Sequence, residues 1–179
     1  NPIKNVNLEI TRNAIQENEV LDTFVQTGFM LDSANARLVL ANDEKIYNFL
    51  SADAKIIRKQ VFMEEQGFKN EFDDIDNISF HIVMYDETRP VATCRVYEDI
   101  VKNEYILGRL SVVKEYRGMS LGAKMIGEAE RIVKEEGGTS IRLHAQCRVT
   151  PFYGQQGYKE YGVIEDDEGC PHIWMKKQL

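Results

Sequence analysis

The stretch Arg117-Gly118-Met119-Ser120-Leu121-Gly122-Ala123 joins an extended apolar segment to an amphipathic helix. Residues 106–113 before it are rich in apolar and β-branched side chains and predict a strand. Free backbone N–H groups at a helix start form an anion site, and two glycines beside an arginine let a phosphate approach them. The stretch therefore predicts a phosphorylated ligand. The helix after it has apolar residues at helical spacing until Gly137-Gly138, namely Leu121, Met125, Ile126, Ala129, Ile132 and Val133.

The spacing of this loop excludes two common phosphate-binding motifs. Only three residues separate Gly118 from Gly122, so the loop matches neither G-x-x-x-x-G-K-[ST] nor G-x-G-x-x-G. A structural explanation stays open, in which the two glycines only permit a tight turn and close packing of the helix.

The composition excludes several classes of protein. The chain has 179 residues, of which 43% are hydrophobic, and this fits one domain with a proper core. A net charge of −7 argues against a nucleic-acid partner. Three widely spaced cysteines, Cys94, Cys147 and Cys170, indicate neither a disulfide framework nor a metal site. No apolar run is long enough to span a bilayer and no signal peptide is recognisable, so we expect a cytoplasmic protein without a membrane partner.

The periodicity predicts an α/β domain over residues 35–179, preceded by an N-terminal extension. The extension, residues 1–34, is expected to be helical and to pack on the domain or on a second copy of the chain in a homodimer. A helix is expected to begin at Asn42 or Asp43 and to end at Gly67. A short helix is expected over 151–156. Strands are expected at 37–41, 80–85, 91–97, 106–113, 140–145, 158–164 and 172–176.

Two motifs in this order resemble those of the GNAT superfamily of acetyl-CoA-dependent N-acetyltransferases. The family's loop pattern Q/R-x-x-G-x-G/A is similar to residues 117–122, with Ser120 where the first glycine normally stands. Its F-Y-x-x-x-G-F segment is similar to residues 152–158, and the R-x-x-V-F-x-x-E-Q of its ElaA-like branch is similar to residues 58–66. The resemblance covers roughly residues 36–179. It implies a mixed central sheet with flanking helices, in which the parallel fourth and fifth strands, 106–113 and 140–145, splay apart.

The resemblance also implies an acetyl-CoA co-substrate that binds between the splayed strands. The acceptor would be an amine on a small molecule or a peptide. Arg117 has the planar donor fork suited to a phosphate, although a solvated surface arginine is the alternative. The pantetheine arm would lie along Leu110, Ser111 and Val112, and the pyrophosphate would lie at Arg117, Gly118, Met119, Ser120, Leu121, Gly122 and Ala123.

Direct transfer to an amine requires two groups that handle protons. An alkyl ammonium with a pKa of roughly 10.4 must lose a proton, which at pH 7 costs about 4 to 5 kcal/mol. Glu65, His81 and His144 are candidate bases, each with a structural alternative as a surface acid or a satisfied histidine. Tyr153 is the candidate donor to the leaving thiolate, with a core aromatic as its alternative. No spacing pairs a cysteine with a histidine, so an acetyl-cysteine route is not favoured.

The expected acceptor site consists of Phe62, Glu65, His81 and Arg95. The acidic residues between 64 and 76 could attract a cationic amine, or could simply be solvated surface. If Arg95 points into the cleft, it could instead bind a carboxylate of the acceptor. The alternative function is a non-catalytic acyl-CoA-binding or sensor module on the same fold.

Overall fold

The computed structural model describes residues 31–32, 37–38 and 43–179. The chain divides into two compact units, residues 1–43 with 85–89 and residues 44–84 with 90–179. Within the first unit, β1 (Leu31–Asp32) and β2 (Arg37–Leu38) form an antiparallel pair. The predicted strand is thus confirmed at 37–38, and residues 39–41 lie outside the described residues. The predicted N-terminal helix also lies outside them, except at β1, which is extended.

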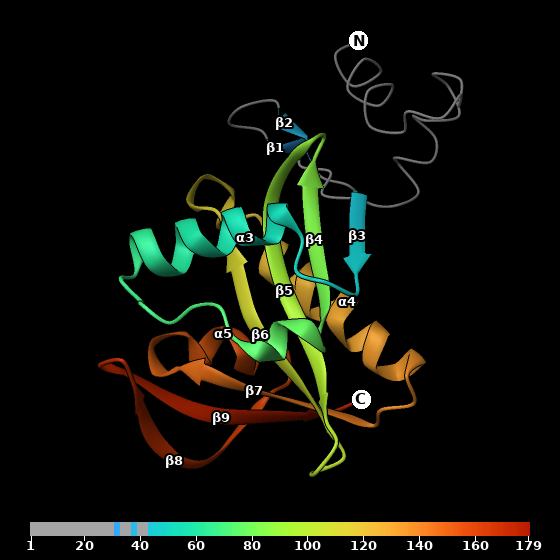
Figure 1. Ribbon diagram of the computed structural model, residues 1–179, viewed down its shortest axis with the longest axis vertical. Helices are drawn as coiled ribbons and strands as arrows, with labels where there is room; N and C mark the ends of the chain where they lie inside the picture. Colours follow the sequence, from blue (N-terminus) through green and yellow to red (C-terminus); the bar gives the residue numbers. More distant parts are fainter. Residues whose placement is uncertain (1–30, 33–36, 39–42) are drawn as a thin grey trace. The chain divides into compact units, whose positions relative to one another are not determined.

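A seven-stranded mixed sheet carries most of the chain, in the order β3-β4-β5-β6-β7-β9-β8 (Figure 1). The pair β6/β7 is parallel, whereas β5/β6, β7/β9 and β8/β9 are antiparallel. The predicted mixed sheet with one parallel pair is confirmed. Its strands are β3 (Asp43–Tyr47), β4 (Phe80–Asp86), β5 (Arg89–Asp99), β6 (Glu104–Val112), β7 (Ser140–Gln146), β8 (Lys159–Asp167) and β9 (Cys170–Gln178).

The helix after the glycine loop, α4 (Leu121–Glu135), has the predicted apolar stripe. Its buried residues are the six expected from the spacing, and the helix packs on β6 and β7. Full burial of a side chain such as Leu121 or Met125 contributes about 1.5 to 3 kcal/mol, so this stripe fixes the start of α4 beside the sheet. The other helices are α3 (Ala52–Arg58), the π-helix η1 (Lys59–Glu65), α5 (Thr150–Gln155) and the 3₁₀ turns η2 (Asp74–Asn77), η3 (Lys114–Tyr116) and η4 (Cys147–Val149).

The predicted start of the first helix was wrong. Residues 43–47 form strand β3, which pairs with β4, and α3 begins only after Ser51. The Ser51 hydroxyl accepts the backbone N–H of Ala54 at 3.2 Å and caps the helix. Ile46 and Phe49, which precede the helix, are 43% and 57% exposed. Pairing with the edge of a sheet supplied the backbone hydrogen bonds that a longer helix would have made.

The parallel strands β6 and β7 separate as predicted. Their ladder runs only from Tyr105 opposite Ile141 to Leu107 opposite Leu143, although both strands continue beyond it. The register between β5 and β6 shifts at the same level, and Arg109 takes a left-handed φ of 54° there. Such a bulge bends the strand and increases its twist. The two strands therefore leave an open gap at their ends.

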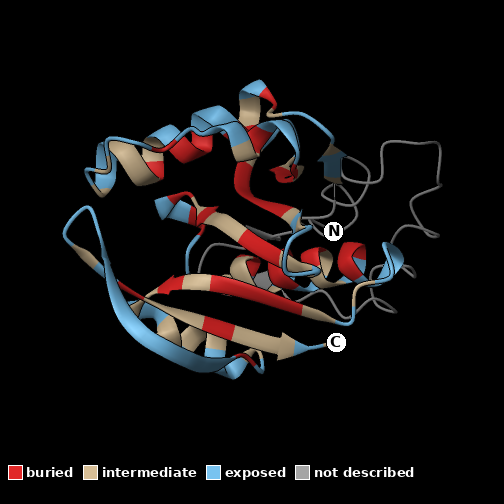
Figure 2. Ribbon diagram, turned by 60° about the horizontal axis from the view of Figure 1, so that its bottom comes forward, coloured by how far each residue is buried: buried red, intermediate tan, exposed pale blue. Residues whose placement is uncertain are grey.

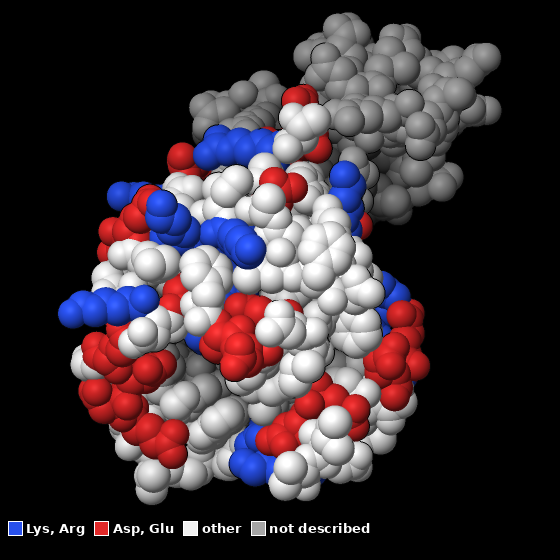
Figure 3. Space-filling view, viewed as in Figure 1, with Lys and Arg blue, Asp and Glu red and all other residues white. Residues whose placement is uncertain are grey.

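Burial falls off toward one edge of the sheet. Figure 2 shows the interior strands buried over much of their length, whereas β8 is exposed throughout. On the face drawn in Figure 3, acidic and basic side chains of the described residues are interspersed. Within the described part of the chain, no helix has both the length and the apolar character needed to cross a bilayer.

Candidate active site

A cavity of about 990 Å³ lies where β6 and β7 separate. Its walls come from the ends of these strands, from η1, from the loop before α4, and from α5. It thus collects residues that are up to 111 positions apart in the chain, from Val61 to His172. The predicted site residues that line it are Phe62, Glu65, Leu110, Ser111, Val112, Arg117, Gly118, Ser120, Leu121, Gly122, Ala123, His144 and Tyr153, whereas Met119, His81 and Arg95 lie outside its lining.

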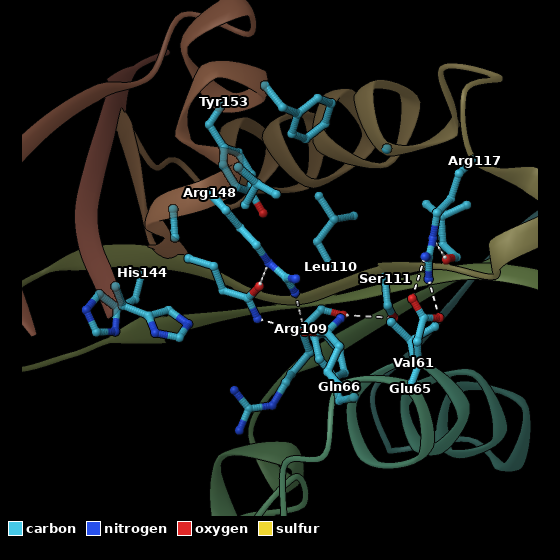
Figure 4. Close-up of a pocket in the computed structure, with 18 of the residues that line it drawn as sticks. Val61, Glu65, Gln66, Arg109, Leu110, Ser111, Arg117, His144, Arg148 and Tyr153 are labelled. Carbon is cyan, nitrogen blue, oxygen red and sulfur yellow. Dashed lines mark hydrogen bonds and ion pairs between the residues drawn. The ribbon is translucent and has the colours of Figure 1, made fainter. Parts of the chain in front are cut away.

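The labelled side chains show the direction of this cavity (Figure 4). The helices α3 and η1 lie on one side of the strands, and α4 and α5 lie on the other. Arg117 and Glu65 occupy one end, His144 occupies the other, and Tyr153 comes from α5 between them. The cavity therefore leads from the glycine loop past Tyr153 to a histidine.

The glycine loop has a backbone that opens toward the start of α4. Gly118 has a φ of 78° and Ser120 a φ of 60°, so two residues of this short loop are left-handed. Ser120 is the N-cap residue of α4, yet its side chain makes no capping hydrogen bond. Because no side chain of the N-cap covers these first N–H groups, they are placed to bind an anion.

Replacing Ser120 by Gly should stabilise the protein. A left-handed conformation costs a non-glycine residue roughly 1 to 2 kcal/mol, and the greater freedom of glycine in the unfolded chain offsets about 0.5 to 1 kcal/mol of that gain. We expect the free energy of unfolding, measured in urea, to rise by about 0.5 to 1 kcal/mol. A decrease would show that the serine hydroxyl has a stabilising role that outweighs its backbone strain.

The two sequence motifs are in contact. A Cβ atom added to Gly122 would lie 3.0 Å from Cζ of Phe152, so the ring of the second motif packs directly on the first. Close packing thus explains Gly122, and the left-handed backbone explains Gly118. Close packing at the glycines does not conflict with an anion site, because the turn that brings α4 against α5 leaves the first N–H groups of α4 without a side-chain cap.

Arg117 and Glu65 form a bidentate ion pair at the loop end of the cavity. The guanidinium nitrogens lie 2.6 and 2.7 Å from the two carboxylate oxygens, and Arg117 Nε donates to the carbonyl of Val112 at 3.0 Å. The hydrogen bond from Arg117 lowers the pKa of Glu65. Since the pair also lies at the far end from His144, we do not retain Glu65 as the base.

Tyr153 both lines the cavity and packs against aromatic neighbours. Its ring lies edge-on to Phe152 at 5.1 Å and to Tyr158 at 6.1 Å between centroids. Burial raises the pKa of the Tyr153 phenol, and Cys94 raises it further. The hydroxyl is therefore protonated throughout the neutral range and is available as a donor.

A histidine pair closes the other end of the cavity. His144 stacks on Trp174 with centroids 4.6 Å apart and lies 5.0 Å from the ring of His172, which also lines the cavity. Burial lowers the pKa of His144, and the nearby His172 lowers it further. His172 was not among the residues predicted from the sequence. It belongs to no motif, and only the antiparallel ladder that places it opposite Gln146 brings it to the end of β7.

Two expected acceptor residues are not at the cavity, and this corrects the prediction. His81 is fully buried, and its Nε2 lies 2.9 Å from the carbonyl oxygen of Asp76. Arg95 is 3% exposed and donates to Asp73 at 2.5 Å and to Asp76 at 2.8 Å. Both side chains are held by the acidic stretch, because a buried charge or polar ring requires a partner.

Two carboxylates of the acidic stretch, Glu71 and Asp76, belong to a buried charge network. Arg58 Nε lies 2.6 Å from Glu71 Oε1, and Arg58 Nη1 lies 2.6 Å from Asp76 Oδ1. Arg109, which does line the cavity, joins the network through Glu71 at 3.1 Å. Glu71 and Asp76 are buried and paired with arginines, so they are not solvated surface, although Glu71 does line the cavity.

A bridge of polar side chains crosses the middle of the cavity and was also missed. Gln146 Nε2 donates to Gln66 Oε1 at 2.9 Å, and Arg148 donates to both glutamine oxygens at 2.8 and 3.1 Å. Arg148 lies between Tyr153 and Gln66 in Figure 4. Gln66 follows η1, and Gln146 ends β7, so the bridge joins two walls that the sequence shows only as separate segments.

Cysteine and metal chemistry have little support at this cavity. Cys94 is 1% exposed, and burial raises the pKa of its thiol. Cys147 and Cys170 are outside the lining of the cavity. In residues 31–32, 37–38 and 43–179, no group of three or more His, Cys, Asp or Glu side chains is arranged to hold a metal ion.

The splayed parallel strands, the open helix start and the tyrosine beside the gap define an N-acyltransferase fold that uses an acyl-CoA donor. Comparison with known families agrees, because residues 50–179 match the acetyltransferase (GNAT) domain. The chain belongs to the GNAT acetyltransferase family and is an acyltransferase.

Individual relatives agree with this assignment. The uncharacterized N-acetyltransferase YjcF of Bacillus subtilis is 32% identical over 144 residues, which cover 78% of this chain and 97% of YjcF. Another Bacillus subtilis protein whose name describes an acetyltransferase is 39% identical over 127 residues, or 68% of this chain and 85% of that protein. The crystal structure of Escherichia coli ElaA superposes with a TM-score of 0.68 at 22% identity, covering 76% of this chain and 99% of ElaA. The ElaA fold is therefore shared.

Proposed function

We propose that this protein transfers an acetyl group from acetyl-CoA to a primary amine by direct attack within a ternary complex. The observation that carries the proposal is a single cavity that joins the open start of α4 to Tyr153 and to the histidine pair. A donor that carries phosphates at one end and a thioester at the other matches a cavity with an anion site at one end and proton-handling groups beyond it.

The residues at the loop fit the phosphate end of acetyl-CoA. The pyrophosphate would be held by the backbone of Gly118 to Ala123 and by the guanidinium group of Arg117. That group makes two parallel hydrogen bonds to the carboxylate of Glu65, a bidentate geometry that also suits a phosphate. Leu110, Ser111 and Val112 lie on β6 beyond its ladder with β7, where they can pair with the pantetheine arm. An aminoglycoside 6'-N-acetyltransferase solved with coenzyme A shares this fold, with a TM-score of 0.59 at 15% identity over 75% of this chain and 96% of that one.

The chain's own residues would handle the protons of the reaction. Acetyl-CoA supplies an acyl thioester that is open to attack by a neutral amine. Tyr153 donates a hydrogen bond to the leaving thiolate, and its raised pKa keeps that proton in place until the thiolate forms. A backbone N–H of Leu110 or Val112 would stabilise the negative charge on the carbonyl oxygen. Buried, protonated Cys94 supports direct transfer rather than an acetyl-cysteine route.

Replacing Arg117 by Ala should weaken coenzyme A binding by about tenfold, because it removes one charge-assisted contact to phosphate at a partly exposed position. Isothermal titration with coenzyme A measures this, and the loss should shrink at high salt because the contact is exposed. Arg131→Ala is the matched control, since Arg131 lies on α4 outside the cavity lining. Equal affinities for both variants and the native protein would contradict a phosphate contact at Arg117.

The decisive experiment is the release of free thiol from acetyl-CoA in the presence of a panel of primary amines. Amine-dependent release supports the transferase. Tight coenzyme A binding without release for any amine would contradict it and would favour the sensor module.

The acceptor amine is proposed to belong to a small molecule or a peptide. The cysteines of the chain are unpaired, which supports a reducing compartment such as the cytoplasm. The predicted homodimer contact in residues 1–34 falls almost entirely outside the described residues and stays a prediction.

A further inference from the structure

We infer that His172 is the group that accepts the proton of the acceptor amine, an inference that rests on the proposed function. Deprotonation at neutral pH needs a base within the cavity whose lone pair is accessible and whose protonated form is stable near pH 7. His172 lines the cavity, yet only 7% of its surface is exposed. Bulk water therefore competes little with a substrate for its ring.

The backbone fixes the tautomer of His172. Its Nδ1 lies 2.8 Å from the carbonyl oxygen of Cys170, and a carbonyl oxygen can only accept a hydrogen bond. Nδ1 must therefore carry the ring proton, so the lone pair of the neutral imidazole is on Nε2. A backbone carbonyl that holds one nitrogen of a histidine in this way sets both the tautomer and the direction of the ring.

The other acids and bases along the cavity are already engaged or too weak. Both oxygens of Glu65 hold Arg117, and Glu71 is paired with Arg58 and Arg109. The Glu168 oxygens accept three N–H groups from Lys69 and Asn70. Carboxylates exposed to solvent are in general too weakly basic to hold a proton near pH 7.

His144 is the remaining competitor, and its surroundings suit a positioning role. Its ring is held flat against Trp174, and its Nε2 is buried without a hydrogen-bond partner. Nε2 lies 3.3 Å from Glu165 Oε2, but the two atoms are not aligned for a hydrogen bond. Among the residues that the structure describes, no backbone group fixes its tautomer as Cys170 does for His172. His144 thus packs beside His172, with a centroid distance of 5.0 Å, and limits where that ring can lie.

Several charged or aromatic groups surround this base from the elements packed against it. His144 faces it from β7, Glu165 and Asp167 come from β8, and Phe68 lies edge-on at 6.5 Å. After the transfer, His172 returns its proton to water before the next turnover.

The proton and electron pairs balance in this scheme. His172 Nε2 takes one proton from the ammonium group, which leaves a neutral amine with a free lone pair. That lone pair forms the new C–N bond with the acetyl carbon as the C–S bond breaks. The departing thiolate accepts a hydrogen bond from Tyr153 and takes up the second proton that the nitrogen loses. The products are an N-acetyl amine and a free thiol.

The first test compares His172→Asn with the native protein. The amide nitrogen of Asn can still donate to the Cys170 carbonyl, so the fold should persist, but no basic nitrogen remains at the position of Nε2. We expect kcat with an alkyl amine to fall at least tenfold, with the KM for acetyl-CoA within about twofold and the midpoint of thermal unfolding nearly unchanged. His144→Asn, as a positioning variant, should lose less activity.

Two further measurements separate catalysis from packing. Added imidazole should restore activity to His172→Ala in a saturable way, and it should not restore His144→Ala. Nitrogen NMR of histidine-labelled protein should show the Nδ1–H tautomer for His172, and this readout needs no substrate; the three histidines of the chain are assigned with single variants.

The inference is overturned if His172→Asn keeps native turnover, if imidazole rescues only His144→Ala, or if the neutral His172 ring carries its proton on Nε2. Native protein that releases no thiol with any amine contradicts the proposed function instead. These outcomes are distinguishable. The variant measurements need a native protein that is active, whereas failure of the proposed function is seen as a native protein without activity.

Discussion

Replacing Tyr153 by Phe should lower kcat by at least 100-fold, which is the lower range for loss of one proton-handling group. The phenol is the donor that lines the cavity between the glycine loop and the histidine pair, and burial raises its pKa so that it keeps its proton. The KM for acetyl-CoA should change by less than about twofold, because the phosphate contacts lie at the other end of the cavity. Steady-state release of free thiol measures both values.

Tyr161→Phe is the matched control, since it removes a hydroxyl from an exposed residue of β8 that does not line the cavity. We expect this variant to have native turnover. Should Tyr153→Phe also retain native turnover, Tyr153 would be only a packing residue against Phe152 and Tyr158.

Replacing Arg58 by Met should destabilise the fold by about 3 to 5 kcal/mol, because it leaves buried carboxylates without a partner. Arg58 makes short contacts with Glu71 and with Asp76, and all three side chains are buried. The Met side chain fills much of the volume, so the loss reports the missing charge. Urea unfolding followed by circular dichroism measures it, and Arg131→Met, at an exposed ion pair of α4, should leave the unfolding midpoint nearly unchanged.

The acid dependence of stability tests the same contacts. Burial alone would raise the pKa of Asp76, but hydrogen bonds from Arg58 and Arg95 lower it to about 2. A carboxyl whose pKa is lower in the folded state stabilises the protein above its unfolded value of about 3.9, and this contribution is lost as the pH falls toward 2. The native protein should therefore lose about 2 kcal/mol across this window, and Asp76→Asn should not show that part of the loss. A native stability that is flat from pH 5 to pH 2 would exclude the network as its source.

Local patterns predicted those parts of the fold that local physics controls. The six apolar positions of α4 and its stop at Gly137-Gly138 could be identified from helical spacing, because burial on one face demands that spacing. The strands β4 to β7 and β9 could also be identified locally, because they contain runs of β-branched and apolar residues. The start of the first helix was predicted wrongly, because Asn42 and Asp43 are as suitable as N-cap residues as Ser51. Only the folded chain shows that residues 43–47 pair with the edge of the sheet instead.

The candidate site divides in the same way. The phosphate loop and Tyr153 are carried by continuous motifs, so the sequence could place them at one cavity. Arg95 and His81 could not be excluded from it, because their acidic partners lie 5 to 22 positions away in the chain and only folding buries them together. His172 could not be found at all, since its place depends on the register between β7 and β9.

By itself, the sequence determined the class of reaction that this chain supports: a glycine loop before a helix and a Phe-Tyr motif after the next strand are local features with fixed spacing. Only the tertiary structure decided which charged side chains remain available to a substrate. The reason is physical, since a carboxylate or imidazole becomes a structural partner or a proton acceptor according to what long-range packing places within about 3 Å of it. In the folded chain, Glu65 pairs with Arg117 and Arg95 pairs with Asp76. The proposed base, His172, lies on a strand that contains no recognisable motif.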